Sequence, residues 1–184
     1  MNGINATKSS FWGITLRTTV AHTVTYFAVG LIAYTLFNYS ARFTDPALSS
    51  FMRQTNDPLV AAGPLFQPIR GVLFGLVFYL LQDIFFRQKN GWLILWISLV
   101  VMGILSTFGP TPGSIEGFIY TNLPLKVQLP GLTEVLSQSF LFSIITYYWV
   151  NHSKTKWLNW VLGILFFAAL ILPALGLLAR QVLS

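Results

Sequence analysis

Long apolar runs recur along this chain, and they constrain its fold more than any other feature. The runs cover approximately residues 13–39, 69–86, 92–108, 132–150 and 157–178. Each is close to the ~20 residues that an α-helix needs to cross a bilayer. Only 9% of the residues are charged, so a water-facing surface could not be covered. The sequence therefore predicts an all-α, polytopic membrane protein with five transmembrane helices, forming a single integral membrane domain over residues 1–184.

Charge and cysteine content exclude several other classes of protein. The formal net charge of +6 would suggest a nucleic-acid partner in a soluble protein, but the basic residues here are spread over helix ends. That distribution fits lipid headgroups, so the lipid bilayer is the expected partner and nucleic acid is not. The chain has no cysteine, which excludes disulfides and thiolate metal sites. The two histidines, His22 and His152, lie at unequal expected depths and do not suit a haem, so we expect no metal and no cofactor.

The charged residues in the short turns predict the orientation. Turns 87–91 and 151–156 concentrate lysine and arginine, and short loops that are rich in these residues stay in the cytoplasm. We therefore expect a cytoplasmic N-terminus, with the long loops 40–69 and 109–131 on the opposite face together with the C-terminus. The expected location is the bacterial inner (plasma) membrane.

The segment from Gly109 to Gly131 cannot continue either of the apolar runs beside it. Its first twelve residues hold two prolines, three glycines and the carboxylate of Glu116. We expect an ordered loop at one membrane face, with the helices arranged around it. A phosphate-binding loop is not favoured, because the Lys-Ser/Thr pair of that motif is missing and Glu116 would repel an anion.

A polar cluster is predicted at the outward face, organised by Arg70. Arg70 follows the prolines that open the second span, where the helix macrodipole disfavours a cation. We expect Glu116 from the loop or Glu134 from the fourth span to compensate it. The cluster comprises Gln67, Arg70, Glu116, Tyr120, Glu134 and Gln138. It is either a ligand pocket or a structural ion pair that holds the loop to the bundle.

The first span carries a second polar set. Thr18, His22 and Thr25 recur at helical spacing, and Arg17 lies beside them. These four residues either line a polar groove or surround a hydrogen-bonded structural histidine. The threonine hydroxyls can bond back to carbonyls of their own helix.

Two further patterns predict packing. Gly71 and Gly75 form a small-x-x-x-small face that suits close helix contact. The third and fifth spans are nearly free of polar residues, which indicates contact with lipid, with a second copy of the chain in a homo-oligomer, or with another membrane protein.

These patterns favour a ligand-binding or transport-related membrane protein with a polar pocket open to the extracytoplasmic face. The alternative is a non-catalytic subunit or scaffold of a larger membrane complex. An enzyme that acts on a lipid-linked substrate through Glu116 or Glu134 ranks third. No nucleophile motif is present, so no catalytic residue is assigned.

Overall fold

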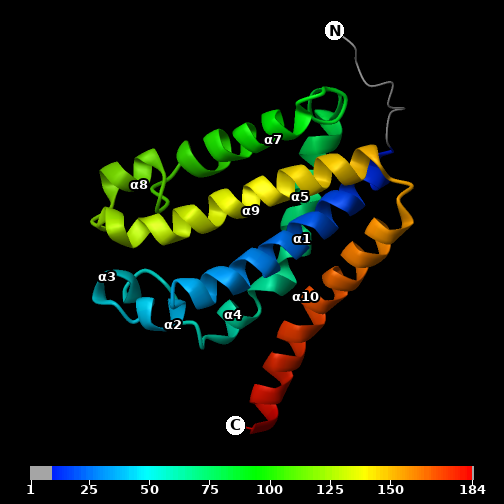
Figure 1. The fold of residues 1–184 in the computed structure, drawn as a ribbon. Helices are drawn as coiled ribbons and strands as arrows, with labels where there is room; N and C mark the ends of the chain where they lie inside the picture. The colour runs from blue at the N-terminus through cyan, green and yellow to red at the C-terminus, as the bar shows by residue number, and fades with distance from the viewer. Residues whose placement is uncertain (1–9, 184) are drawn as a thin grey trace.

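The computed structural model describes residues 10–183, and this part of the chain is 78% helical and contains no strand (Figure 1). The helices are α1 (Phe11–Leu36), α2 (Tyr39–Arg42), α3 (Pro46–Ser49), α4 (Pro58–Ala61), the 3₁₀ helix η1 (Gly63–Phe66), α5 (Gln67–Leu80), α6 (Gln82–Phe85), α7 (Gly91–Val100), the π-helix η2 (Val101–Leu105), α8 (Ile115–Tyr120), α9 (Leu125–Asn151) and α10 (Lys156–Leu183). The predicted all-helical class is confirmed.

Three helices within residues 10–183 are long and apolar enough to cross a membrane. They are Phe11–Leu36, Gly63–Leu80 and Lys156–Val182. The apolar helix Gly91–Leu105 is shorter, and α9 is long but includes polar residues such as Glu134 and Gln138. A membrane protein is therefore supported, whereas the third predicted span (92–108) and the fourth (132–150) stay predictions.

α1 is the central helix of the bundle. It packs against α5, α9 and α10, and α7 packs against the outer side of α9. Figure 1 shows α10 diverging from α1 as both helices leave their common end. The helices were expected to be arranged around the glycine-proline segment, but this segment lies with α8 at the outer end of α9 (Figure 1). The helices pack around α1 instead, which contacts α5, α9 and α10.

The small-x-x-x-small prediction for α5 is confirmed. A Cβ atom added at Gly71 would lie 2.5 Å from the Cα of Thr19, and one at Gly75 would lie 2.7 Å from the Cα of Thr15. Such distances leave no room for any side chain, so backbone meets backbone. This contact sets how closely α5 approaches α1.

The two ends of the bundle differ. Figure 1 shows the short turns 86–90 and 152–155 near the start of α1, and the longer segments 37–66 and 106–124 toward its end. We refer to the latter as the loop end. There, Arg42 Nη2 donates to the carbonyl oxygen of Val127 over 3.2 Å, which joins segment 37–66 to the first turn of α9.

The glycine-proline loop is ordered by the buried amide of Gln128. Its Oε1 accepts from the backbone N–H of Gly113 at 2.7 Å, and its Nε2 donates to the carbonyl of Leu123 at 2.7 Å. Gly113 has a φ of +87°, a conformation that favours glycine. Ser114 then caps α8 by accepting from Gly117 N. The segment is thus held by its own hydrogen bonds, as expected of a structural turn.

Candidate functional site

A cluster of two buried residues, His22 and Gln67, and the exposed Arg70 joins α1 to the start of α5. The Gln67 Nε2 donates to the carbonyl of Gly63 at 3.0 Å, which turns its Oε1 toward His22. That oxygen lies 3.2 Å from His22 Nε2 and 3.5 Å from Arg70 Nη1. Since Oε1 can only accept, His22 donates from Nε2 and its Nδ1 carries no proton in the neutral ring.

His22 is only 2% exposed, and aromatic side chains surround it. Its ring contacts those of Phe74 and Phe142 at centroid distances of 5.0 and 5.2 Å. Its Nδ1 has no hydrogen-bond partner. A second proton would place a positive charge in this apolar surrounding and beside Arg70, so the cluster favours the neutral imidazole. A hydrogen-bonded structural role for His22 accounts for these contacts.

The remaining members of the polar set on α1 do not form one open groove. Thr25 donates to the carbonyl of Ala21 at 2.8 Å, as expected for a hydroxyl that bonds back to its own helix. Thr18 is fully buried, and its Oγ1 has no partner. Arg17 donates to the carbonyl of Gly13 at 2.8 Å and lies over the ring of Trp149. Arg17 therefore belongs to the end of the bundle with the short turns, apart from His22.

The expected ion pair of Arg70 is absent. Within residues 10–183, neither Glu116 nor Glu134 forms a salt bridge with Arg70. Arg70 is exposed and instead contacts Gln67 and the ring of Phe74. The helix already begins at Gly63, because Pro64 occupies its first turn, where a missing N–H costs nothing. Arg70 thus lies well inside the helix, beyond the first turn in which the macrodipole acts, and needs no carboxylate.

Glu134 has a different partner at the loop end. Tyr39, at the start of α2, donates its hydroxyl to Glu134 Oε2 at 2.5 Å. Burial raises the pKa of the Tyr39 phenol, and the hydrogen bond to Glu134 raises it further. This pair joins α2 to α9 across 95 positions of sequence.

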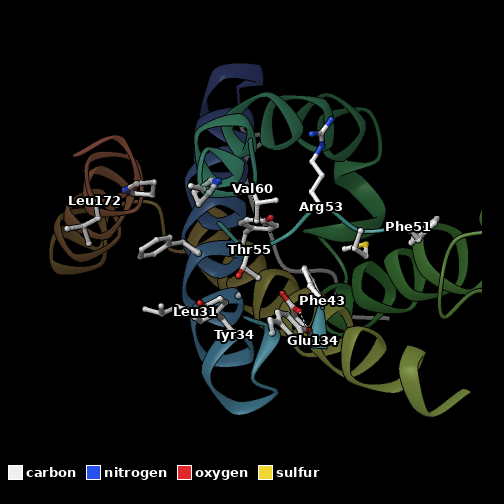
Figure 2. A pocket seen from close by; sticks show the side chains of 17 residues that line it. Leu31, Tyr34, Phe43, Phe51, Arg53, Thr55, Val60, Glu134 and Leu172 are labelled. Atoms are coloured by element: carbon white, nitrogen blue, oxygen red, sulfur yellow. Dashed lines mark hydrogen bonds between the residues drawn. The ribbon is translucent and has the colours of Figure 1, made fainter. Parts of the chain in front are cut away.

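The Glu134–Tyr39 pair lies in the wall of a cavity of about 720 Å³ at the loop end, which we call the loop-end cavity (Figure 2). Ligand sites of proteins typically measure ~300–1,000 Å³. The lining residues come from α1, segment 39–64, α9 and α10. They are Tyr26, Phe27, Gly30, Leu31, Tyr34, Tyr39, Phe43, Phe51, Met52, Arg53, Thr55, Val60, Ala61, Pro64, Glu134, Leu172 and Pro173.

Of the six residues predicted for the polar cluster, only Glu134 lines this cavity. Gln67 and Arg70 belong to the His22 cluster. Glu116 lies in the first turn of α8, and Tyr120 ends that helix with 71% of its surface exposed. Gln138 lies one turn after Glu134 on α9. The structure therefore divides the predicted cluster into separate places, and it does not bring Glu116 and Glu134 together as an acid–base pair.

Sequence reasoning missed most of the cavity lining. Tyr39 was read as the last residue of the first span, and residues 51–61 as part of a loop. The aromatic content of that loop and the Asp-Pro caps at Asp45 and Asp57 were the signals available. They indicate an ordered loop, but they do not indicate which helix faces it.

The described part of the chain, residues 10–183, brings no three histidine, aspartate or glutamate side chains together as metal ligands. Comparison with protein families, with curated proteins and with solved structures finds no match to this chain. The candidate site therefore stands on its geometry alone.

Proposed function

We propose that this chain is a five-span integral membrane protein that binds an amphiphilic ligand in the loop-end cavity, as part of a ligand-binding or transport-related role. The spans are α1, η1–α5 with α6, α7–η2, α9 and α10. The positive charge of the short turns favours a cytoplasmic N-terminus and a loop end outside, and we propose a bacterial inner membrane as the location. The cavity then opens toward the extracytoplasmic face.

The observation that carries the proposal is a cavity of ligand size with a mostly apolar wall and one carboxylate. The cavity is partly open, and its volume of about 720 Å³ lies within the range that is typical of ligand sites. Phenylalanine, leucine and tyrosine side chains dominate its wall, and Glu134 with Tyr39 supplies a polar point. Such a wall suits a molecule with an apolar body and a polar head.

Binding has more support than passage across the membrane. The cavity reaches Tyr26 on α1, which lies one turn beyond His22 toward the loop end. Below it, Phe74 and Phe142 pack on the ring of His22, and Gly71 and Gly75 press α5 against α1. A solute would have to separate these helices in order to continue. The proposed ligand therefore reaches the loop-end cavity and stops there in this conformation.

The absence of native cysteine allows a direct test. Thr55→Cys places a single thiol in the cavity wall, and the rate of its reaction with a water-soluble maleimide reports occupancy. In nanodiscs of dioleoylphosphatidylcholine, added dodecanol should slow this reaction but leave that of Ser50→Cys, an exposed position outside the lining, unaffected.

A substitution that fills the cavity should remove the protection that dodecanol gives to Thr55→Cys. Ala61→Phe adds a ring to the cavity wall and should weaken protection of Thr55→Cys by about tenfold or more, since overpacking costs ~1–3 kcal/mol. Ala41→Phe, on the exposed side of α2 and outside the lining, is the matched control. Equal slowing at both thiols, or full protection in Ala61→Phe, would contradict the proposed site.

One observation favours the alternative of a non-catalytic subunit. α10 is the least buried of the three candidate spans, with apolar residues such as Trp160 and Phe167 exposed along it. A partner helix or a second copy could cover this face. Native mass spectrometry in mild detergent tests it: a stoichiometric partner or oligomer supports a subunit role, and a clean monomer counts against it.

A further inference from the structure

We infer that the ligand of the loop-end cavity carries a cationic head, such as a protonated amine, on an apolar chain, and that the head lies against Glu134. This inference deepens the proposed function and rests on it. It arises from three features of the described residues: the unpaired oxygen of Glu134, the occupied arginines of the loop end, and the direction in which the cavity opens.

One oxygen of Glu134 is left for a ligand. Tyr39 donates to Oε2, whereas no hydrogen bond to Oε1 is formed within residues 10–183. Oε1 faces Gly30 on α1, where an added Cβ would lie 3.7 Å from it. A glycine at this position leaves the space beside the carboxylate open. A donor group of a ligand can therefore reach Oε1 next to the α1 backbone.

The arginines of the loop end are occupied elsewhere. Arg53 lies in the cavity wall, but its Nη1 pairs with Asp57 Oδ2 at 3.0 Å, and Figure 2 shows its guanidinium pointing away from Glu134. Arg42 donates to the carbonyl of Val127. Within residues 10–183, Glu134 forms no salt bridge. A half-buried carboxylate without a counter-ion is costly, and a cationic ligand head removes that cost.

The apolar part of the ligand extends from Glu134 toward α10. In Figure 2, Leu172 of α10 lies across the cavity from Glu134, with Leu31 of α1 between them. Leu31 and Leu172 are 55% and 57% exposed, and α1 and α10 diverge at this end of the bundle (Figure 1). In a bilayer these leucines face lipid chains. A chain that starts at Glu134 therefore passes between α1 and α10 into the membrane, which argues for a bilayer-borne amphiphile over a small soluble amine.

The test uses three probes on Thr55→Cys protein in nanodiscs of dioleoylphosphatidylcholine at pH 7. Dodecylamine has the head and chain, dodecanol has the same chain with a neutral head, and butylamine has the head with a short chain. Dodecylamine should protect the thiol at about tenfold lower concentration than dodecanol, since charge-assisted hydrogen bonds are roughly twice as strong as neutral ones. Butylamine should give little protection.

Glu134→Gln should reduce the dodecylamine-to-dodecanol preference to near unity while protection by dodecanol remains. Comparison of this ratio between variants cancels the different partition of the two probes into lipid. Glu116→Gln, on α8 outside the cavity, should keep the full preference. Gly30→Val, which crowds Oε1 but keeps the carboxylate, should also reduce the preference, and it serves as the second variant if Glu134→Gln does not fold.

The outcomes separate this inference from the proposed function. Equal protection by dodecylamine and dodecanol, or an amine preference that survives in Glu134→Gln, overturns the cationic head and leaves amphiphile binding intact. Protection by butylamine as strong as that by dodecylamine overturns the bilayer-borne chain and identifies a small soluble amine. No protection by any probe overturns both the inference and the proposed function.

Discussion

The glycines beside the two halves of α1 have different surroundings. This contrast separates the tightly packed part of the bundle from the part that is proposed to bind a ligand. Along the first half, a Cβ atom added at Gly71 or Gly75 of α5 would lie only 2.5–2.7 Å from a backbone atom of α1, so no space remains between the two helices. Along the second half, Gly30 meets only a carboxylate oxygen at 3.7 Å, and a cavity opens. Glycine allows close approach where a helix covers it, and it leaves a site open where none does.

The largest effect is expected from Gly71→Ala. The added methyl would lie 2.5 Å from a backbone atom of α1, which cannot rotate away, so α5 must move. We expect a loss of about 1–3 kcal/mol or more in unfolding free energy, measured by thermal unfolding in detergent. Gly163→Ala on α10, where nothing lies within 4 Å, should be neutral or slightly stabilising. Similar behaviour of the two variants would remove the distinction between packed and open glycines.

The next effect concerns the buried His22 cluster. Gln67→Leu removes the acceptor of His22 Nε2–H and leaves that donor unsatisfied in an apolar core. The expected cost is about 1–3 kcal/mol. Gln138→Leu, a half-buried glutamine outside both sites, should cost much less. In a double-mutant cycle, His22→Phe combined with Gln67→Leu should recover part of the loss, and strict additivity would show that the two side chains do not interact.

Local patterns predicted the structural half of the molecule well. Gly71 and Gly75 lie four residues apart on one helix, so their packing role could be inferred without knowledge of the partner. Asp45 with Pro46 is likewise a local pattern, an N-cap followed by proline in the first turn, and in the structure α3 begins there.

The binding half depended on contacts between residues far apart in the sequence, which no local pattern reports. Glu134 was selected as a possible counter-ion of Arg70, but its partner is Tyr39, which lies 95 positions away in the sequence. The error over Arg70 arose from reading Gly63-Pro64 as an interruption. Proline is tolerated in the first turn of a helix, so the same dipeptide begins the helix instead.

A smaller effect is expected from Tyr39 at high pH. Its pKa is raised in the folded protein, so the unfolded chain loses this proton first as the pH rises. The stability that Tyr39 contributes is therefore complete below the ordinary tyrosine value of ~10 and is lost as the pH rises through the higher folded value. The thermal midpoint should fall above pH ~10 in the wild type and fall less steeply in Tyr39→Phe. A parallel decline in both proteins would show that the phenol is not held by Glu134.

The smallest effect belongs to the exposed rim of the loop-end cavity. The N–H of Leu59 and the nearby Arg53 lower the pKa of Asp57. A lowered carboxylate pKa stabilises the fold above the unfolded value of ~3.9, and this contribution is lost as the pH falls through the folded value. Asp57→Asn keeps an N-cap oxygen but loses the charge. The variant should therefore melt slightly below the wild type at pH 7, and the difference should shrink as the pH falls below ~3.9. A difference that stayed constant over this range would show that the charge of Asp57 is not its cause. The cap geometry of α4 would then contribute more than the exposed pair with Arg53.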